Sequence, residues 1–250
     1  MKNTKRVHET RWDRIRQQLD VFLLLDIYVN EKFPFIVHHP FFDSSAAMLR
    51  SGELVDITAS EENLDKAREM MRERIELIDS VSDIVLQVNK PYLMTVFSYI
   101  EPYLDLADFS TMLSSIWTYM EFPSACPDVT LSKMIHYFQQ ADPKILMDDA
   151  DYKMYQDLPE VVTVYRGVGD SIDGKSGNPK GLSYTTSYET AEWFSNRFGT
   201  GYVVKLEIPK ERVLACFDGN ESEVVVNTRG LEPIRMDMEL TLEEDIGGIE

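Results

Sequence analysis

Cysteine is scarce in this chain of 250 residues, where only Cys126 and Cys216 occur. Because the two lie far apart and form no CxxC pair, the sequence gives no sign of a disulfide framework or a cysteine-based zinc site. Long apolar runs are missing as well: "VFLLL" is too short to cross a bilayer, and the segment before it is too polar for a signal peptide. We therefore expect a soluble chain, cytoplasmic where it is made, with no membrane partner.

Basic residues are also under-represented, because 25 Lys and Arg stand against 43 Asp and Glu, a net charge of −18. Such a charge repels phosphate backbones, which argues against nucleic acid as a partner. The negative charge would favour binding to a basic protein surface, or it only keeps the chain soluble. Histidine is scarce too, with four residues. The adjacent His38 and His39 point apart, and no HExxH motif is present, so no metal is expected.

Helical periodicity dominates the first part of the sequence, residues 1–158. Apolar residues recur there at spacings of three and four, as on one face of a helix. Ser60 is placed to cap one of these helices, and Asp128 or Thr130 is placed to cap another. We expect helices in these segments: 10–33, 60–90, 91–104, 108–121 and 130–142.

The apolar period changes to two in residues 159–250, and the residues become β-branched and aromatic. One helix, which Ser187 is placed to cap, interrupts the strands. Helices followed by strands predict an α+β protein with a break near Pro159. The expected strands are 161–168, 181–187, 201–208, 212–216, 223–226 and 233–238.

Two polar motifs lie at the ends of the first two expected strands. Arg166 ends the first strand, where a guanidinium can offer two parallel hydrogen bonds to a phosphate, and Gly167 lets a ligand approach the backbone. Thr185, Thr186 and Ser187 end the second strand. Their hydroxyls can cap the next helix, or they can hold a catalytic carboxylate in place. Each motif alone is most often structural.

A third motif, "ESE", heads the strand 223–226. If the chain is extended there, Glu221 and Glu223 point to the same side of the sheet. Two like charges side by side cost stability, which a solvated strand face or a chemical role can offset. A carboxylate pair can stabilise a sugar oxocarbenium ion and deprotonate an attacking group.

The order of the three motifs is more specific than any one of them. "YRG" on a first strand, "TTS" on the next and "ESE" before a later one resemble the mono-ADP-ribosyltransferase superfamily of the Arg–Ser–Glu class, over about residues 160–240. The resemblance implies an ADP-ribosyltransferase fold of two packed, mainly antiparallel sheets in residues 159–250. It also implies NAD+ as co-substrate and a target protein as partner. Residues 1–158 would cover the NAD cleft or select the target.

The resemblance assigns the binding of NAD+ to the first two motifs. Arg166 would hold the NAD phosphates and the nicotinamide-side ribose, with Gly167 beside it. Thr185, Thr186 and Ser187 would complete the site. Thr185 departs from the family pattern, which has serine there, and its extra methyl group needs room in the pocket.

The resemblance assigns the chemistry to the third motif. Glu223 would stabilise the oxocarbenium ion, held by a hydrogen bond from Thr185, and Glu221 would position or activate the acceptor. In the family, glutamate at the position of Glu221 goes with arginine as the acceptor residue. Phe217 would lie on the loop that reads the target protein.

Two alternatives remain open on the sequence. The same fold can serve an NAD glycohydrolase, in which water is the acceptor. A non-catalytic module or inhibitor could instead use the net charge of −18 to bind a basic partner. The biological setting is also open: the protein could be an effector, a phage enzyme, the toxin of a toxin–antitoxin pair or a host-regulating enzyme.

Overall fold

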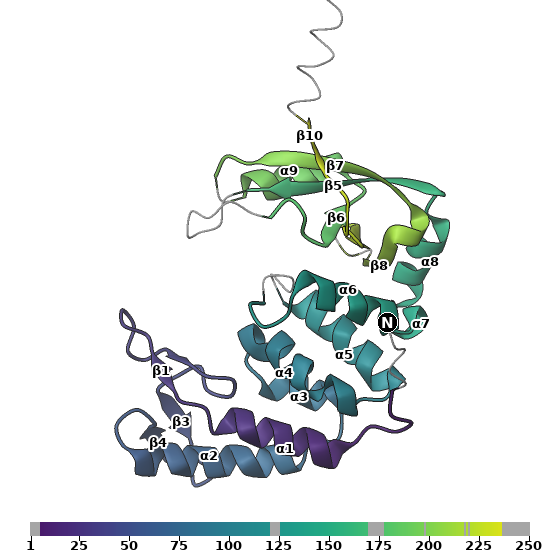
Figure 1. The fold of residues 1–250 in the computed structure, drawn as a ribbon. Coiled ribbons are helices and arrows are strands. Elements are labelled where there is room, and N and C mark those ends of the chain that lie inside the picture. Colours follow the sequence, from purple (N-terminus) through teal and green to yellow (C-terminus); the bar gives the residue numbers. More distant parts are fainter. Residues whose placement is uncertain are drawn as a thin grey trace, which may run out of the picture. The chain divides into compact units, whose positions relative to one another are not determined.

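The computed structural model describes residues 6–120, 126–169, 178–197, 199–217, 219 and 221–236. The chain divides into two compact units, residues 1–129 and 130–250 (Figure 1). Helices and antiparallel sheets occur together, so the expected α+β class is confirmed. The expected break near Pro159 marks the change from helices to the main sheet and falls inside the second unit.

The first unit buries the apolar faces of its helices, among them Ile15, Phe97 and Phe109, in one core. It also contains two hairpins within residues 28–56, where the sequence analysis expected helices or no regular structure. The elements are α1 (Trp12–Leu23), β1 (Tyr28–Val29), β2 (Val37–His38), β3 (Ala46–Met48), β4 (Leu54–Asp56), α2 (Glu61–Glu76), α3 (Val81–Gln87), α4 (Leu93–Ile100) and α5 (Leu106–Tyr119).

The helix expected over 60–90 is two helices, so that expectation was wrong in part. Ser60 caps α2 as expected, accepting a hydrogen bond from the Asn63 backbone N–H. The helix ends at Glu76, and α3 begins after a second cap, Ser80, which accepts from the Asp83 N–H. A serine followed three residues later by an acidic residue is itself a helix-start signal, so the break was readable from the sequence.

The second unit is built on one antiparallel sheet. Among the described residues its strands lie in the order β10-β7-β5-β6-β9-β8. Strands β5 and β6 share only the pair Tyr165–Thr185, so the sheet is nearly divided into two three-stranded halves. The elements are α6 (Leu131–Gln140), α7 (Pro143–Leu146), α8 (Asp149–Asp157), β5 (Val161–Val168), β6 (Ser183–Thr185), α9 (Tyr188–Asn196), β7 (Tyr202–Pro209), β8 (Val213–Phe217), β9 (Glu223–Val226) and β10 (Ile234–Arg235).

Two basic side chains attach the helices of this unit to the sheet. Lys210, after β7, donates to the carbonyls of Gln156 and Leu158 at the end of α8 (2.7 and 2.9 Å). Arg229, after β9, donates to the carbonyl of Ser132 in α6 (2.8 Å). Charge-assisted bonds of this kind are stronger than neutral ones. The helices α6–α8 therefore belong with the sheet, which is why the compact unit begins before the change in secondary structure.

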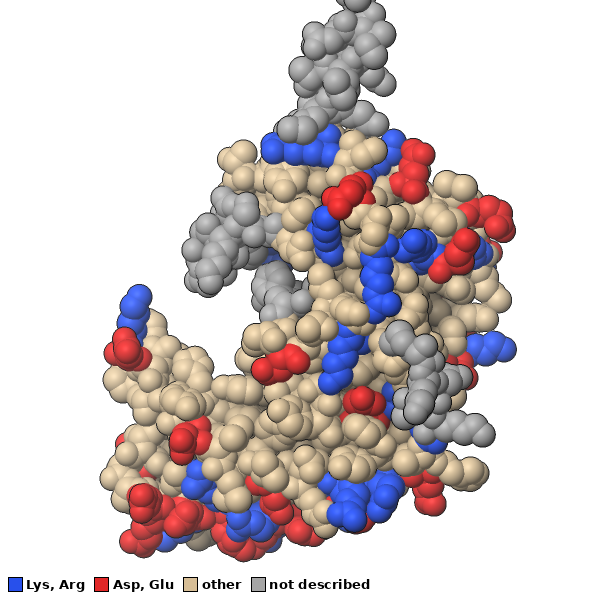
Figure 2. All heavy atoms as spheres, in the orientation of Figure 1, with Lys and Arg blue, Asp and Glu red and all other residues tan. Residues whose placement is uncertain are grey.

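Acidic side chains gather along α2 on the face shown in Figure 2, with Lys and Arg interspersed. Lys66 pairs with Glu62 and Arg72 with Glu69 on the same helix. The acidic charge of this helix is thus partly compensated along its own surface. None of the described helices is both long and apolar enough to cross a membrane.

Candidate active site

The three motifs meet on neighbouring strands of the second unit. Tyr165 of β5 is paired with Thr185 of β6, Thr185 with Glu223 of β9, and Glu223 with Phe217 of β8. This row crosses the sheet at the junction between its two halves. Arg166 follows Tyr165 directly. Residues that are far apart in the sequence therefore come together at one place.

The Arg166 guanidinium is held by backbone carbonyls of the segment 178–183. Nε donates to Asn178 O (3.1 Å) and Nη1 donates to Ser183 O (2.7 Å). Gly181 lies against the guanidinium, because a Cβ added there would be 2.6 Å from Arg166 Cζ. No acceptor for Nη2 is found among the residues that the structure describes.

Charge also links Arg166 to the third motif. Burial lowers the pKa of Arg166, while the nearby Tyr184 hydroxyl and the Glu223 carboxylate raise it. Burial raises the pKa of Tyr184 to about 12, so this hydroxyl stays neutral, and it donates to Pro179 O (3.0 Å). The Glu223 carboxylate therefore favours the charged form of the guanidinium.

Thr185 does not make the hydrogen bond that the resemblance implied. Its hydroxyl donates to the backbone carbonyl of Glu221 (2.8 Å) and accepts from the backbone N–H of Ser187 (3.1 Å). The side chain is 5% exposed. Thr185 thus ties the turn before Glu223 to the start of α9, and a hydrogen bond from it to the Glu223 carboxylate is not part of this structure.

The two glutamates are not related by strand alternation, so that expectation was wrong. Ser222 between them has a φ of 43°, in the left-handed region, and the strand begins only at Glu223. A side chain in this region costs about 1–3 kcal/mol, so the surrounding turn has to hold it. Glu221 is exposed and lines a hollow with residues of α9, away from the extended strand.

Gly167 serves a packing need rather than the approach of a ligand. A Cβ at this position would meet the backbone of α9, at Ala191 O and at Ser195 N. Gly169 and Gly201 likewise lie against Ser195 O. Glycine is therefore needed here because helix α9 packs directly on β5 and β7.

The remaining candidate residues have structural positions. Ser187 caps α9 as expected, accepting from the Thr190 N–H (3.1 Å), and Thr186 is exposed beside it. Phe217 is the last residue of β8, is 7% exposed and is paired with Glu223. It was expected on a target-reading loop and instead packs within the sheet, because the strand continues to this residue.

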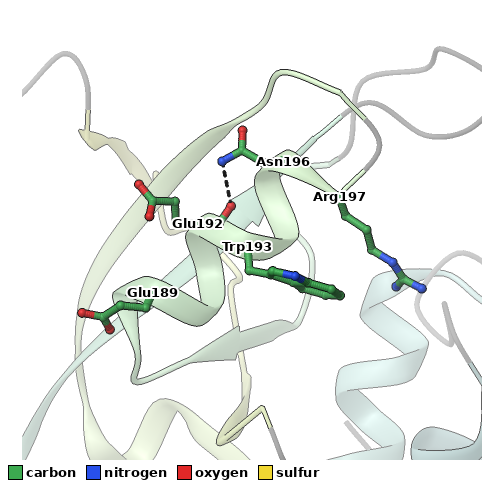
Figure 3. Close-up of a pocket in the computed structure, with 5 residues that line it drawn as sticks. All are labelled: Glu189, Glu192, Trp193, Asn196 and Arg197. Carbon is green, nitrogen blue, oxygen red and sulfur yellow. Dashed lines mark hydrogen bonds between the residues drawn. The ribbon is translucent and has the colours of Figure 1, made fainter.

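The outer face of α9 carries an exposed aromatic residue that was not singled out from the sequence (Figure 3). Trp193 is 59% exposed there, and with Phe194, Glu189, Thr190 and Glu221 it lines a hollow of about 370 Å³. The signal was present in "ETAEWF", where a large aromatic residue falls outside the apolar face that Ala191 defines. From the sequence we also expect Phe198 on that apolar face and a mobile connector over residues 169–181; Phe198 and residues 170–177 lie outside the described residues.

Comparison of the chain with protein-family models, with curated proteins and with solved structures gave no match in any of the three.

Proposed function

We propose that this protein is an NAD+-dependent mono-ADP-ribosyltransferase with an ADP-ribosyltransferase fold in its second unit, and that it modifies arginine in a target protein. The observation that carries the proposal is the cross-strand row through Thr185 and Glu223, with Arg166 next to it and electrostatically coupled to Glu223. These are the three positions of the sequence signature. Strand pairing joins Thr185 to Glu223 and to Tyr165, the neighbour of Arg166, although Arg166 and Glu223 are 57 positions apart in the chain.

Arg166 is the proposed anion-binding group. A guanidinium presents several N–H donors in one plane, and backbone carbonyls already hold two of its nitrogens. The held guanidinium is pre-oriented, so binding a phosphate would cost little side-chain entropy.

Glu223 is the proposed catalytic carboxylate. In the reaction the bond between nicotinamide and the ribose C1′ breaks, and its electron pair leaves with nicotinamide. Positive charge then develops on the ribose, and a carboxylate fixed at the start of β9 stabilises it. A nitrogen of the acceptor guanidine forms the new bond to C1′, and its proton passes to Glu221.

Labelled NAD+ and a cell lysate test the proposal. Label that moves from NAD+ to a protein band, and that is lost with Glu223→Ala, supports a transferase. Free ADP-ribose and nicotinamide without a labelled band would show a glycohydrolase on the same site. If NAD+ neither binds nor is consumed, the proposal fails, and binding of a basic partner by the acidic chain becomes the function to examine.

A substitution of Glu221 should separate ADP-ribosyl transfer from NAD+ hydrolysis. Because its carboxylate would act on the acceptor and not on the ribose, Glu221→Ala should abolish transfer and keep part of the NAD+ hydrolysis. Equal loss of both activities would contradict this division between the two glutamates.

A further inference from the structure

Exposed apolar side chains are concentrated at the hairpin that β1 and β2 form in the first unit. Tyr28 is 67% exposed, Phe35 63% and Phe33 51%, although the turn of a hairpin is ordinarily polar. Three more large apolar residues close to them in the chain are exposed as well: Leu24, Leu25 and Val29. We call residues 24–38 the arm. A concentration of exposed apolar residues of this kind is typical of an interaction surface.

The turn of the arm is held by its own hydrogen bonds. Asn30 donates from its backbone N–H to Ile36 O (2.9 Å), and its side-chain oxygen accepts from the N–H groups of Lys32 and Phe33 (3.0 Å each). Ile36 donates to Phe33 O (2.8 Å). The rings of Phe33 and Phe35 lie next to each other, with 6.0 Å between their centroids. The arm therefore presents these rings from a fixed turn, which lowers the entropy that binding would cost.

The first unit covers only one face of the hairpin. Tyr28 is paired with His38 and Val29 with Val37, and cross-strand partners share a face. Val37 is buried, whereas Tyr28 and His38 are exposed on the opposite face. Among the described residues β1 pairs only with β2, so its other edge is open (Figure 1). The outer face and the open edge are both accessible to another polypeptide.

The exposed surface of the arm is large enough for a specific contact. Three aromatic side chains that are exposed by half to two thirds leave roughly 350 Å² of apolar surface per chain in water. The neighbouring leucines and valine bring this area closer to the roughly 600 Å² per partner that the smaller specific interfaces bury. The arm alone can therefore supply most of an interface.

The charges of the arm favour a second copy of this chain as the occupant. Glu31 and Lys32 are adjacent in the turn, are exposed, and form no ion pair with the residues that the structure describes. In a two-fold contact a patch meets its own copy, so Glu31 of each chain can face Lys32 of the other. The net charge of −18 would repel an anionic membrane, and a purely basic partner would set like charge against Lys32.

We propose that the arm forms a symmetric dimer of this chain. Tyr28, Phe33 and Phe35 of the two copies pack together, and Glu31 of each copy pairs with Lys32 of the other. This inference concerns the first unit and is independent of the proposed transferase function.

Sedimentation velocity of the full chain between about 1 and 100 µM tests the dimer. The wild type should change from monomer to dimer over this range, because an interface near the lower limit of area gives a modest affinity. Phe35→Ser and Tyr28→Ser should each raise the Kd at least about tenfold, since each substitution removes a ring from both copies. Leu86→Ser, at a leucine of α3 that is 81% exposed and lies outside the arm, is the control and should dimerise like wild type.

Charge exchange in the turn tests the two-fold pairing. Glu31→Lys alone and Lys32→Glu alone should each raise the Kd about fivefold, because like charges then face each other in the dimer. The double variant should return to the wild-type Kd, since opposite charges face each other again. These substitutions are at exposed positions, and circular dichroism checks that every variant keeps its fold.

A wild type that remains monomeric at about 100 µM overturns the inference. A dimer that both ring substitutions leave unchanged, or that Leu86→Ser weakens as strongly as they do, overturns it as well. Absence of recovery in the double variant overturns the two-fold pairing of Glu31 with Lys32. Flotation with phosphatidylcholine vesicles is the final control: a monomer that floats, and that Phe35→Ser releases, would assign the arm to a membrane surface in place of a second copy.

Discussion

At the scale of single residues, Arg166 shows how a candidate anion-binding side chain is positioned. Its guanidinium sits between two backbone carbonyls and the bare Cα of Gly181. The guanidinium is the far end of a flexible side chain, so it can move if a methyl group is added at residue 181. Such a movement would change its orientation toward an anion while leaving the fold in place.

Gly181→Ala should therefore raise the KM for NAD+ on the order of tenfold, the value of one charge-assisted hydrogen bond. The free energy of unfolding should change by less than about 1 kcal/mol, because a side-chain end and not backbone has to give way. Steady-state kinetics and urea unfolding measure the two effects. Gly219→Ala is the control, because no atom of the described residues lies within 4 Å of a Cβ at that position. If Gly181→Ala left the KM for NAD+ unchanged, this would contradict the proposal that Arg166 binds the anion.

The candidate residues could be predicted from the sequence, but not all of their contacts. The apolar period of two placed Arg166, Thr185 and Glu223 on three separate strands, and the family resemblance implied that they meet; the structure pairs these strands. The same-side relation of the two glutamates failed, because it assumed an extended Ser222, which is in fact left-handed. Turn conformation at one residue depends on the tertiary hydrogen bond from Thr185 to Glu221 O, and alternation rules do not contain that bond.

At the scale of elements, α9 packs closely on the strands beneath it. Gly167, Gly169 and Gly201 lie against backbone atoms of the helix, where no side chain fits. This contact fixes the start of α9, and with it Ser187 and the turn tied by Thr185. The position of the candidate row through Thr185 and Glu223 thus depends on helix packing.

Gly167→Ala should destabilise the protein by about 1–3 kcal/mol, because the added methyl group meets backbone that cannot rotate away. Urea unfolding followed by circular dichroism measures the loss. A variant of normal stability that has lost only NAD+ binding would show that the glycine serves the ligand, as the sequence alone had suggested.

Helices and strands were predictable from the sequence where the pattern of apolar residues was long enough to show a period of 3.6 or of two residues. Strands 161–168 and 223–226 match the structure in their bounds, and the other strands of the second unit match within a few residues. The hairpins β1–β2 and β3–β4 were missed because strands of two or three residues are too short to show alternation. Their pairing is set by contacts in the first unit and not by local pattern.

At the scale of the whole molecule, the stability of the chain should depend on the protonation of one buried histidine. His39 in the first unit is 1% exposed, stacks on Phe42 and accepts from the Phe41 N–H through Nδ1 (3.1 Å). Burial, with a smaller contribution from the Arg68 charge, lowers the pKa of His39 from 6.5 to about 4. The unfolded chain therefore takes up a proton on this ring at a higher pH than the folded chain does.

The contribution of His39 to stability is complete above pH 6.5 and is lost as the pH falls toward 4, by about 3 kcal/mol in all. Urea unfolding at pH 7 and pH 4.5 should show this loss in the wild-type chain. His39→Asn, which keeps an acceptor for the Phe41 N–H and does not titrate, should lose less stability between the two pH values. His38→Asn, at the exposed neighbour, should behave like wild type. Equal pH dependence in His39→Asn and wild type would contradict this account.

The central claim for the molecule is that Glu223 acts on NAD+ in the second unit. The most direct test measures nicotinamide release from NAD+ in the presence of agmatine, a small guanidine that serves as acceptor. The assay compares purified wild type with Glu223→Gln. Glu207→Gln, at an exposed glutamate of β7, is the control. We predict that Glu223→Gln lowers the rate by about a hundredfold or more, as expected when a group that stabilises developing charge is removed, while its unfolding free energy stays close to wild type. Glu207→Gln should keep full activity. Nicotinamide release by Glu223→Gln at the wild-type rate, or no release by the wild type, would contradict the account.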